Sequence, residues 1–144
     1  MQMTYSEAGI ELTKAFEGCE LMPYQDGGGV WTVGFGSTHK VVPGVAITQD
    51  QADADLVRNV QSAVDCVNNC VTVDLTQGQF DSCVDFTFNL GSGSFRNSTL
   101  LKKLNAGDYD GACAELAKWV HDNGKVVVGL QRRREAEQVQ WESA

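Results

Sequence analysis

Residues 17–36 read EGCELMPYQDGGGVWTVGFG, and this stretch decides how the rest of the chain is interpreted. Two short runs rich in β-forming residues flank Asp26-Gly-Gly-Gly29, a pattern typical of a β-hairpin with a flexible loop. The positions from Val30 to Phe35 alternate, so we expect successive side chains to face opposite sides of the hairpin. Before it, residues 6–17 have helical spacing and are followed by Gly18, a residue that commonly ends a helix. The sequence therefore predicts one helix that leads directly into a hairpin.

After the hairpin the pattern becomes helical. Thr48 with Gln51, and Thr76 with Gln79, have the spacing of capping boxes, which predict helices over 49–69 and from residue 77 onward. Further helical patterns follow at 98–105, 109–121 and 130–142. The expected fold is a single, mainly helical α+β domain over residues 1–144. A small hairpin lobe at about 18–46 and a larger helical lobe, 47–144 plus the N-terminal helix, would flank a cleft.

Composition excludes several classes of protein. The chain has 144 residues, 42% hydrophobic and 21% charged, which does not fit a disordered or fibrous protein. No apolar run approaches the ~18 residues needed to cross a membrane, and residues 1–16 lack the features of a signal peptide. We therefore expect synthesis in the cytoplasm without stable membrane insertion. The net charge of −8 argues against nucleic-acid binding, although basic residues gather at 96–134.

The cysteines do not form a zinc signature, because no CxxC pair occurs and His39 and His121 lie far apart. Cys66 and Cys70 are four residues apart on a predicted helix, which suits either a metal pair or a stripe of core residues. The core interpretation is favoured, since a free buried cysteine behaves as a small hydrophobic residue. The sequence therefore predicts neither a metal nor a cofactor.

Three residues near the hairpin suit glycoside hydrolysis. Glu17 ends the predicted helix, Asp26 lies in the hairpin loop and Thr32 lies on the returning strand, so a carboxylic acid, a carboxylate and a hydroxyl can share one side. Glycosidases use one carboxylic acid to protonate the leaving oxygen and a second carboxylate on the opposite face of the sugar. A Glu and an Asp nine residues apart carry little weight alone, because most such pairs are solvated surface charges.

The context makes the spacing E-x8-D-x5-T specific. The segments FEGCELMPYQDGGGVWTVGFGST, LTQGQFDSCVDFTFNLGSGSFRNSTLLKKLNAGDY and WVHDNGKVVVGLQRRREAE resemble the phage-type lysozymes, family 24 of the glycoside hydrolases, and in particular endolysins of lambdoid phages. The resemblance runs over roughly residues 8–142. It implies that Glu17 is the general acid, Asp26 the second carboxylate and Thr32 a residue that holds the attacking water. It also implies hydrolysis of the β-1,4 bond between N-acetylmuramic acid and N-acetylglucosamine in peptidoglycan, with inversion.

The resemblance suggests one supporting residue. The family pattern GLxxRRxxE falls on residues 129–137, and an arginine there lies near the catalytic glutamate in relatives, which assigns this role to Arg133. The other two residues of Arg132-Arg133-Arg134 are expected to be solvated. Trp31, on the hairpin, suits either the core or a platform for a sugar ring, whereas Trp119 and Trp141 are expected in the core.

Two other functions are compatible with the same substrate. A lytic transglycosylase needs an acid but no second carboxylate, so Asp26 and Thr32 favour hydrolysis. An inactive peptidoglycan-binding module is disfavoured by the complete set of three residues. With no signal-anchor segment in the sequence, we expect the protein to wait in the host cytoplasm and to reach the cell wall in the periplasm once a holin opens the inner membrane. We expect it to be a monomer. Some relatives are controlled by thiol exchange near the catalytic glutamate, but an incidental thiol is the favoured interpretation of Cys19.

Overall fold

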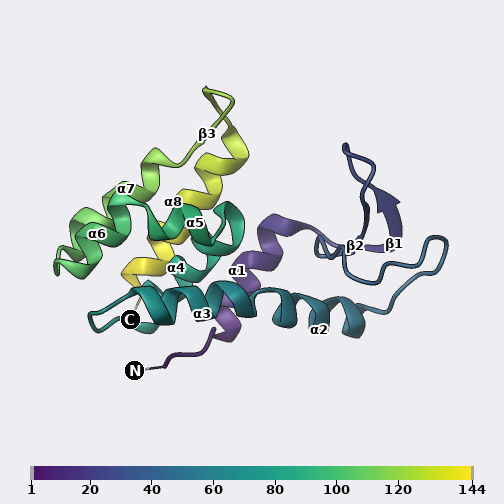
Figure 1. Cartoon of the computed structure of the whole chain (residues 1–144), viewed down its shortest axis with the longest axis horizontal. Helices are drawn as coiled ribbons and strands as arrows, with labels where there is room; N and C mark the ends of the chain where they lie inside the picture. Colours follow the sequence, from purple (N-terminus) through teal and green to yellow (C-terminus); the bar gives the residue numbers. More distant parts are fainter. Residues whose placement is uncertain (1, 144) are drawn as a thin grey trace. The chain divides into compact units, whose positions relative to one another are not determined.

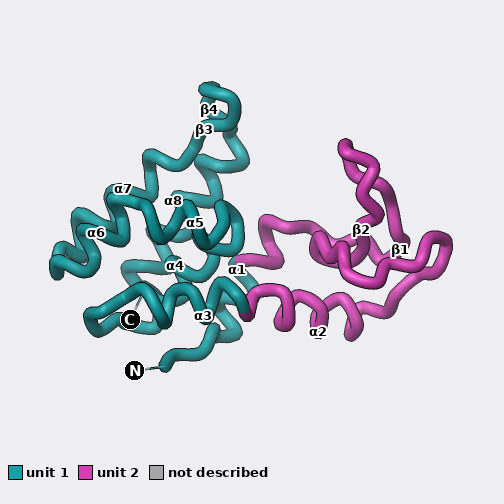
Figure 2. The backbone as a smooth tube through the Cα atoms, in the orientation of Figure 1, with its two compact units in different colours: residues 1–12, 62–144 teal, residues 13–61 magenta. Residues whose placement is uncertain are grey.

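The computed structural model describes residues 2–143 and shows a mainly helical α+β protein, which confirms the predicted fold class (Figure 1). The chain forms two compact units, residues 1–12 with 62–144 (unit 1) and residues 13–61 (unit 2) (Figure 2). Along the chain the elements are α1 (Glu7–Glu17), β1 (Glu20–Gln25), β2 (Trp31–Gly34), α2 (Gln49–Asn59), α3 (Gln61–Cys70), α4 (Gln77–Leu90), α5 (Ser92–Arg96), α6 (Thr99–Asn105), α7 (Tyr109–Glu115), a 3-10 turn (Leu116–Lys118), β3 (His121–Asp122), β4 (Lys125–Val126) and α8 (Val128–Glu142). None of the helices in the described part of the chain is long and apolar enough to span a membrane.

Unit 2 contains the predicted hairpin. Strand β1 pairs antiparallel with β2, with Tyr24 opposite Thr32, and the register shifts between Glu20 and Tyr24. All residues from Thr32 to Phe35 are buried, so both faces of this part of the hairpin are covered. The reason is that α2 packs against β2. A Cβ added at Gly34 would lie 3.3 Å from the Ala52 Cβ atom of that helix.

Lys14 fixes the last turn of α1 within unit 2. Its Nζ atom lies 3.2 Å from a carboxylate oxygen of Asp53 on α2 and 5.6 Å from the centre of the Phe35 ring. The hydrogen bond from Gln49 and the Lys14 ammonium both lower the pKa of Asp53. These contacts hold the end of α1, and with it Glu17, against α2 and the end of the hairpin.

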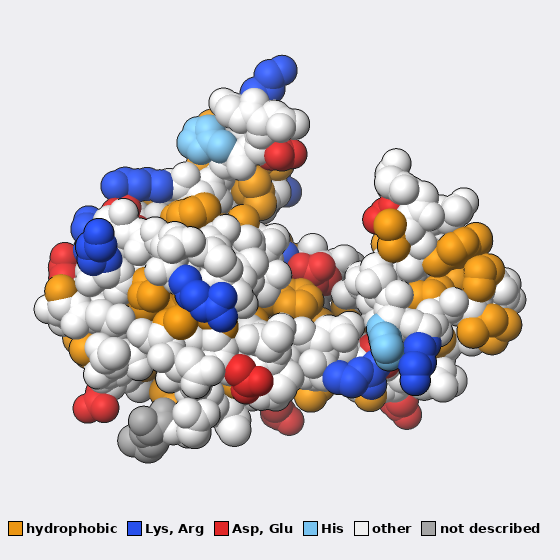
Figure 3. Space-filling model, in the orientation of Figure 1, with side chains coloured by type: hydrophobic (Ala, Val, Ile, Leu, Met, Phe, Trp, Pro, Cys, Tyr) orange, Lys and Arg blue, Asp and Glu red, His pale blue; other side chains and the backbone are white. Residues whose placement is uncertain are grey.

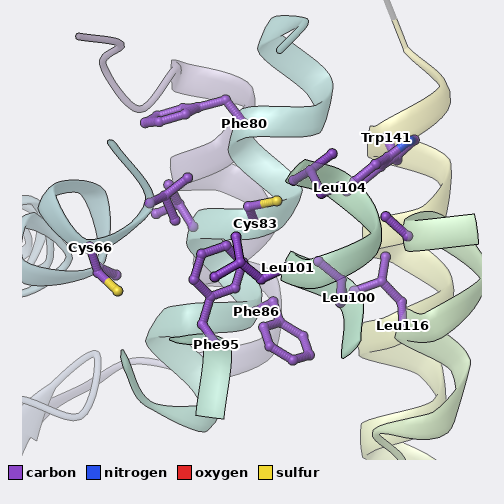
Figure 4. Close-up of a cluster of buried hydrophobic side chains, with 14 of the residues drawn as sticks. Cys66, Phe80, Cys83, Phe86, Phe95, Leu100, Leu101, Leu104, Leu116 and Trp141 are labelled. Atoms are coloured by element: carbon purple, nitrogen blue, oxygen red, sulfur yellow. The ribbon is translucent and has the colours of Figure 1, made fainter. Parts of the chain in front are cut away.

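Unit 1 is organised around α4, whose residues are buried almost continuously from Phe80 to Thr87. Figure 4 shows the apolar cluster around this helix, to which α3, α5, α6 and α8 contribute side chains. Phe86 makes edge-on contacts with Phe95 and Trp119, at ring-centre distances of 6.2 and 5.3 Å, and Trp141 is buried as predicted. Each large side chain buried in this way contributes about 1.5–3 kcal/mol, which makes the cluster the main source of stability in the unit.

Helices α4 and α8 approach each other closely at Gly78. A Cβ at this position would stand 2.2 Å from the Gln140 carbonyl oxygen, so only glycine fits. The Ser82 hydroxyl lies 2.7 Å from the Glu137 carbonyl oxygen, to which it donates a hydrogen bond. The contact sets the register of α8 against α4.

Some predicted boundaries were wrong. The single helix expected over 49–69 is two helices, because the backbone at Val60 opens to ψ −12° and the chain bends there. The helix expected over 109–121 ends at Glu115 and is followed by the small hairpin of β3 and β4. Asn123 and Gly124, which join these strands, both have positive φ, the conformation of a tight hairpin turn. Helix α5 was not predicted.

Candidate active site in the hairpin unit

Glu17 is the last residue of α1 and lines a pocket of about 610 Å³ in unit 2. The helix stops there because Gly18 turns the chain with φ +67°, a conformation open to glycine. The side chain of Glu17 is half-buried. The pocket is lined by Glu17, Gly18, Cys19, Glu20, Met22, Pro23, Tyr24 and Gly34. The predicted acid therefore lies in a hollow of the surface between the end of α1 and the hairpin.

A tight turn after β2 lies against the Glu17 carboxylate. Val33 and Ser37 exchange two backbone hydrogen bonds of 2.9 Å, which closes the turn. Within it Gly36 has φ +80°, and a Cβ added there would stand 3.6 Å from Oε1 of Glu17. The turn thus brings backbone, without a side chain, close to the carboxylate.

The hairpin loop holds Asp26 in one orientation although the residue is exposed. Its Oδ1 atom accepts hydrogen bonds of 2.9 Å from the backbone amides of Gly28 and Val30. Its own backbone amide donates to the Val30 carbonyl oxygen at 2.9 Å. Two donors on one oxygen restrain the carboxylate and leave Oδ2 available to accept from other donors.

Thr32 places a hydroxyl on β2 beside this loop. The residue is 5% exposed, and its Oγ1 atom donates to the Val30 carbonyl oxygen at 3.1 Å. Because the hydroxyl proton is used in this way, Oγ1 can act toward a further partner only as an acceptor. Thr32 and Asp26 are therefore tied to the same residue, Val30, from opposite ends of one loop.

Apolar side chains are unusually exposed on unit 2. Figure 3 shows them gathered over the hairpin and the loop beyond it. Trp31 is 38% and Tyr24 is 42% exposed, so Trp31 is not a core residue. Exposed apolar patches of this kind commonly mark ligand-binding surfaces. The exposed large hydrophobic residues of the unit are Leu21, Met22, Tyr24, Val30, Trp31, Val42, Val45 and Val57.

Arg133 lies on α8 in unit 1 and is buried, with 5% exposure. Its Nε and Nη2 atoms donate to the two carboxylate oxygens of Asp85 at 2.9 and 2.8 Å. This two-point geometry fixes the guanidinium plane. The pairing of Arg133 with Glu17 stays a prediction.

The expectation that two of the three arginines are solvated was wrong for Arg134, which is 1% exposed. It donates to Asn89 at 2.8 Å, forms an ion pair with Glu137 at 2.7 Å and lies over the Phe86 ring at 5.3 Å. Burial and the adjacent Asp85 carboxylate raise the pKa of Glu137 above its ordinary value, although Arg134 acts in the opposite direction. The Arg134 guanidinium, predicted to be solvated, is therefore held by buried partners.

Cys19 lines the same pocket as Glu17, and its Sγ atom lies 3.9 Å from Nε2 of Gln49. The five cysteines are free thiols. Among residues 2–143, no group of three or more His, Cys, Asp or Glu side chains is arranged to hold a metal ion.

The chain is similar to known proteins in both sequence and fold. The sequence model of the family described as phage lysozyme matches residues 14–137. An endolysin of Acyrthosiphon pisum secondary endosymbiont phage 1 is 45% identical over 99% of this chain and all of its own length. The muramidase domain of SpmX from Asticaccaulis excentricus is 36% identical and superposes with a TM-score of 0.91 over 98% of this chain and 99% of its own. The endolysin from Escherichia coli O157:H7 phage FAHEc1, 33% identical, also has a TM-score of 0.91, over 99% of this chain and 96% of its own.

The chain belongs to the phage lysozyme family, whose members are glycoside hydrolases. It spans the full length of the endolysin of the Acyrthosiphon pisum endosymbiont phage but only 52% of the matching endolysin of Bacillus phage B103. It is therefore a phage endolysin of the lysozyme type that acts on peptidoglycan.

Proposed function

We propose that the chain hydrolyses the β-1,4 bond between N-acetylmuramic acid and N-acetylglucosamine, with Glu17 as the general acid. The observation that carries this proposal is the position of Glu17, which lies half-buried in a pocket of about 610 Å³ beside the hairpin that bears Asp26 and Thr32. A glycosidic oxygen bound in this pocket receives its proton from Glu17 as the bond to the sugar breaks.

Asp26 and Thr32 act together on the attacking water in this proposal. The water donates one hydrogen bond to Oγ1 of Thr32 and another to Oδ2 of Asp26. The hydroxyl proton of Thr32 is itself donated to the Val30 carbonyl oxygen. Asp26 draws the proton from the water as it attacks the anomeric carbon, and its negative charge stabilises the cationic sugar. Attack on the face opposite the leaving group inverts the configuration of that carbon.

Two residues have supporting roles in the proposal. The exposed ring of Trp31 provides a platform for a sugar of the glycan strand. Arg133, whose guanidinium is fixed by Asp85, holds the Glu17 side chain in place. Neither role requires a metal or another cofactor.

The test is digestion of purified peptidoglycan, followed by mass spectrometry of the released muropeptides. Hydrolysis leaves reducing ends, whereas a lytic transglycosylase leaves anhydro ends, which are lighter by one water. Proton NMR of the earliest products then reports the configuration of the new anomeric centre. Reducing ends in the α configuration support the proposal. Anhydro ends would replace the hydrolase with the transglycosylase, and β-configured products would exclude inversion.

We further propose that a holin delivers the enzyme from the host cytoplasm to the wall. Helix α1 carries Glu7, Glu11 and Lys14 along its length and ends at Glu17, and moving such charged groups through the apolar interior of a bilayer is costly. The chain expressed alone in a Gram-negative host should be tolerated, and lysis should follow when a co-expressed holin or chloroform opens the inner membrane. Lysis on expression alone, stopped by blocking protein export, would contradict this route.

A further inference from the structure

Cys66 and Cys70 form a close pair of thiols on one side of α3. Their Sγ atoms are 3.9 Å apart, one helical turn from each other. Cys66 is 3% exposed and belongs to the apolar cluster of unit 1, as labelled in Figure 4, whereas Cys70 is partly exposed at the same face. The pair therefore has one sulfur anchored in the core and the other accessible from the surface.

The separation of the two sulfurs suits a shared metal ion. A thiolate binds zinc-like ions at about 2.3 Å, so two thiolates on a tetrahedral ion are about 3.8 Å apart. The observed 3.9 Å matches this spacing without rearrangement of the helix. Residues four apart lie on the same face of a helix, which explains why the two sulfurs lie close together.

We propose that Cys66 and Cys70 form a two-thiolate site for a soft, thiophilic metal ion such as Cd²⁺ or Cu⁺, independent of the hydrolase site. Thiolate ligands select soft ions over Mg²⁺ or Ca²⁺. Binding converts both thiols to thiolates and releases one proton from each, while the ion forms two metal–sulfur bonds. The remaining coordination positions are taken by solvent or by a small thiol.

The surroundings of the pair permit this chemistry. The Ser92 carbonyl oxygen lies 4.0 Å from Sγ of Cys66. Burial and the neighbouring Cys66 raise the pKa of the Cys70 thiol, whereas a hydrogen bond from Arg96 favours its thiolate. The ion has to displace the protons, which a soft ion with high affinity for thiolate does readily.

The experiment uses the reduced full-length chain and CdCl₂ as the probe. Titration is followed by the thiolate-to-cadmium charge-transfer absorbance and by native mass spectrometry, and the thiols protected from alkylation are identified by peptide mapping. We expect one Cd²⁺ per chain, with Cys66 and Cys70 protected together. Losing even an outer partner of a metal ligand costs about 10–100-fold in affinity, so Cys70→Ser should weaken binding by more than tenfold.

Cys19→Ser is the matched control, because Cys19 is an exposed single thiol in unit 2. This variant should bind Cd²⁺ as tightly as the wild type does. Cys66→Ala provides a second variant of the pair that places no hydroxyl in the core. Circular dichroism of each variant reports that it is folded. Equal affinity of wild type, Cys70→Ser and Cys66→Ala, or loss of binding in Cys19→Ser alone, would overturn the proposal. Because the readout is metal binding, the result does not depend on the proposed hydrolase mechanism.

Discussion

Arg133 and Asp85 form a buried ion pair in which two nitrogens meet two carboxylate oxygens, at 2.9 and 2.8 Å. Arg133 is 5% exposed and Asp85 is 0% exposed, so protein groups rather than water determine the position of the guanidinium. The pair joins α8 to α4, the central helix of unit 1. It therefore links the two helices and fixes the arginine to which we assign a supporting role.

Asp85→Ala should strongly destabilise the protein, because it leaves the Arg133 guanidinium buried without its carboxylate. Removing one partner of a buried ion pair costs about 3–5 kcal/mol. The free energy of unfolding, measured by urea denaturation, provides the check. Asp122→Ala, at an exposed position, should have little effect and serves as the control. Equal midpoints for the two variants would show that the folded protein does not need Asp85 to compensate the buried Arg133 charge.

The free energy of unfolding of Glu137→Gln, compared with that of the wild type, should increase as the pH rises. The folded protein holds the Glu137 proton more tightly than the unfolded chain, because its pKa is raised by burial and by Asp85. Stability linked to this group is therefore complete below the unfolded pKa of about 4.3 and falls as the pH rises toward the raised folded pKa. Glutamine does not titrate and lacks this loss. The free energy of unfolding of both proteins is measured from pH 4 to pH 8. The same pH dependence in the two proteins would contradict the prediction.

Gly36→Ala should lower lytic activity by more than its effect on stability accounts for. The substitution places a methyl group 3.6 Å from Oε1 of Glu17 at a position with φ +80°, where a side chain costs about 1–2 kcal/mol. Gly44→Ala is the matched control, because Gly44 has φ +81° and no atom within 4 Å of the added Cβ. For each variant, the change in kcat is compared with the change in the free energy of unfolding. The same activity in both variants would show that Gly36 matters only for its backbone.

Thr32→Val should keep the fold and lose much of the activity, because valine has the same shape but lacks the oxygen that accepts a hydrogen bond from the water. The lost bond to the Val30 carbonyl oxygen should cost only about 1 kcal/mol of stability. Thr32→Ser retains the hydroxyl and should remain active. Initial rates on purified peptidoglycan, together with melting temperatures, separate the two effects. A fully active Thr32→Val would remove Thr32 from the mechanism.

Local signals in the sequence predicted much of the fold. Both capping boxes are formed, with Thr48 bound to Gln51 and Thr76 to Gln79. The break at Val60 was missed because apolar residues continue through it with helical spacing, so periodicity carries no mark of the bend. The hairpin of β3 and β4 had a signal that was overlooked, the Asn-Gly pair at 123–124.

The candidate site was predictable only in part. The spacing of Glu17, Asp26 and Thr32 identified the residues, and the structure adds what orients them, namely the amides on Asp26 and the carbonyl oxygen that receives the Thr32 proton. The burial of Arg134 was not predictable from its charge, because, besides Glu137 on its own helix, it is held by Asn89 on α4. Pairing across elements of this kind has no local sequence signal.

The most direct test of the account compares Glu17→Gln with Glu20→Gln. Both glutamates line the same pocket, so the two variants remove the same charge from neighbouring positions. The amide that replaces the Glu17 carboxyl group has no acidic proton for the leaving oxygen, and loss of a general acid costs about 10²–10⁴-fold in rate. We therefore predict that Glu17→Gln, folded by circular dichroism, releases reducing ends from purified peptidoglycan at under about one hundredth of the wild-type rate, whereas Glu20→Gln remains close to wild type. A Glu17→Gln variant that keeps wild-type activity would contradict the central claim that Glu17 is the acid.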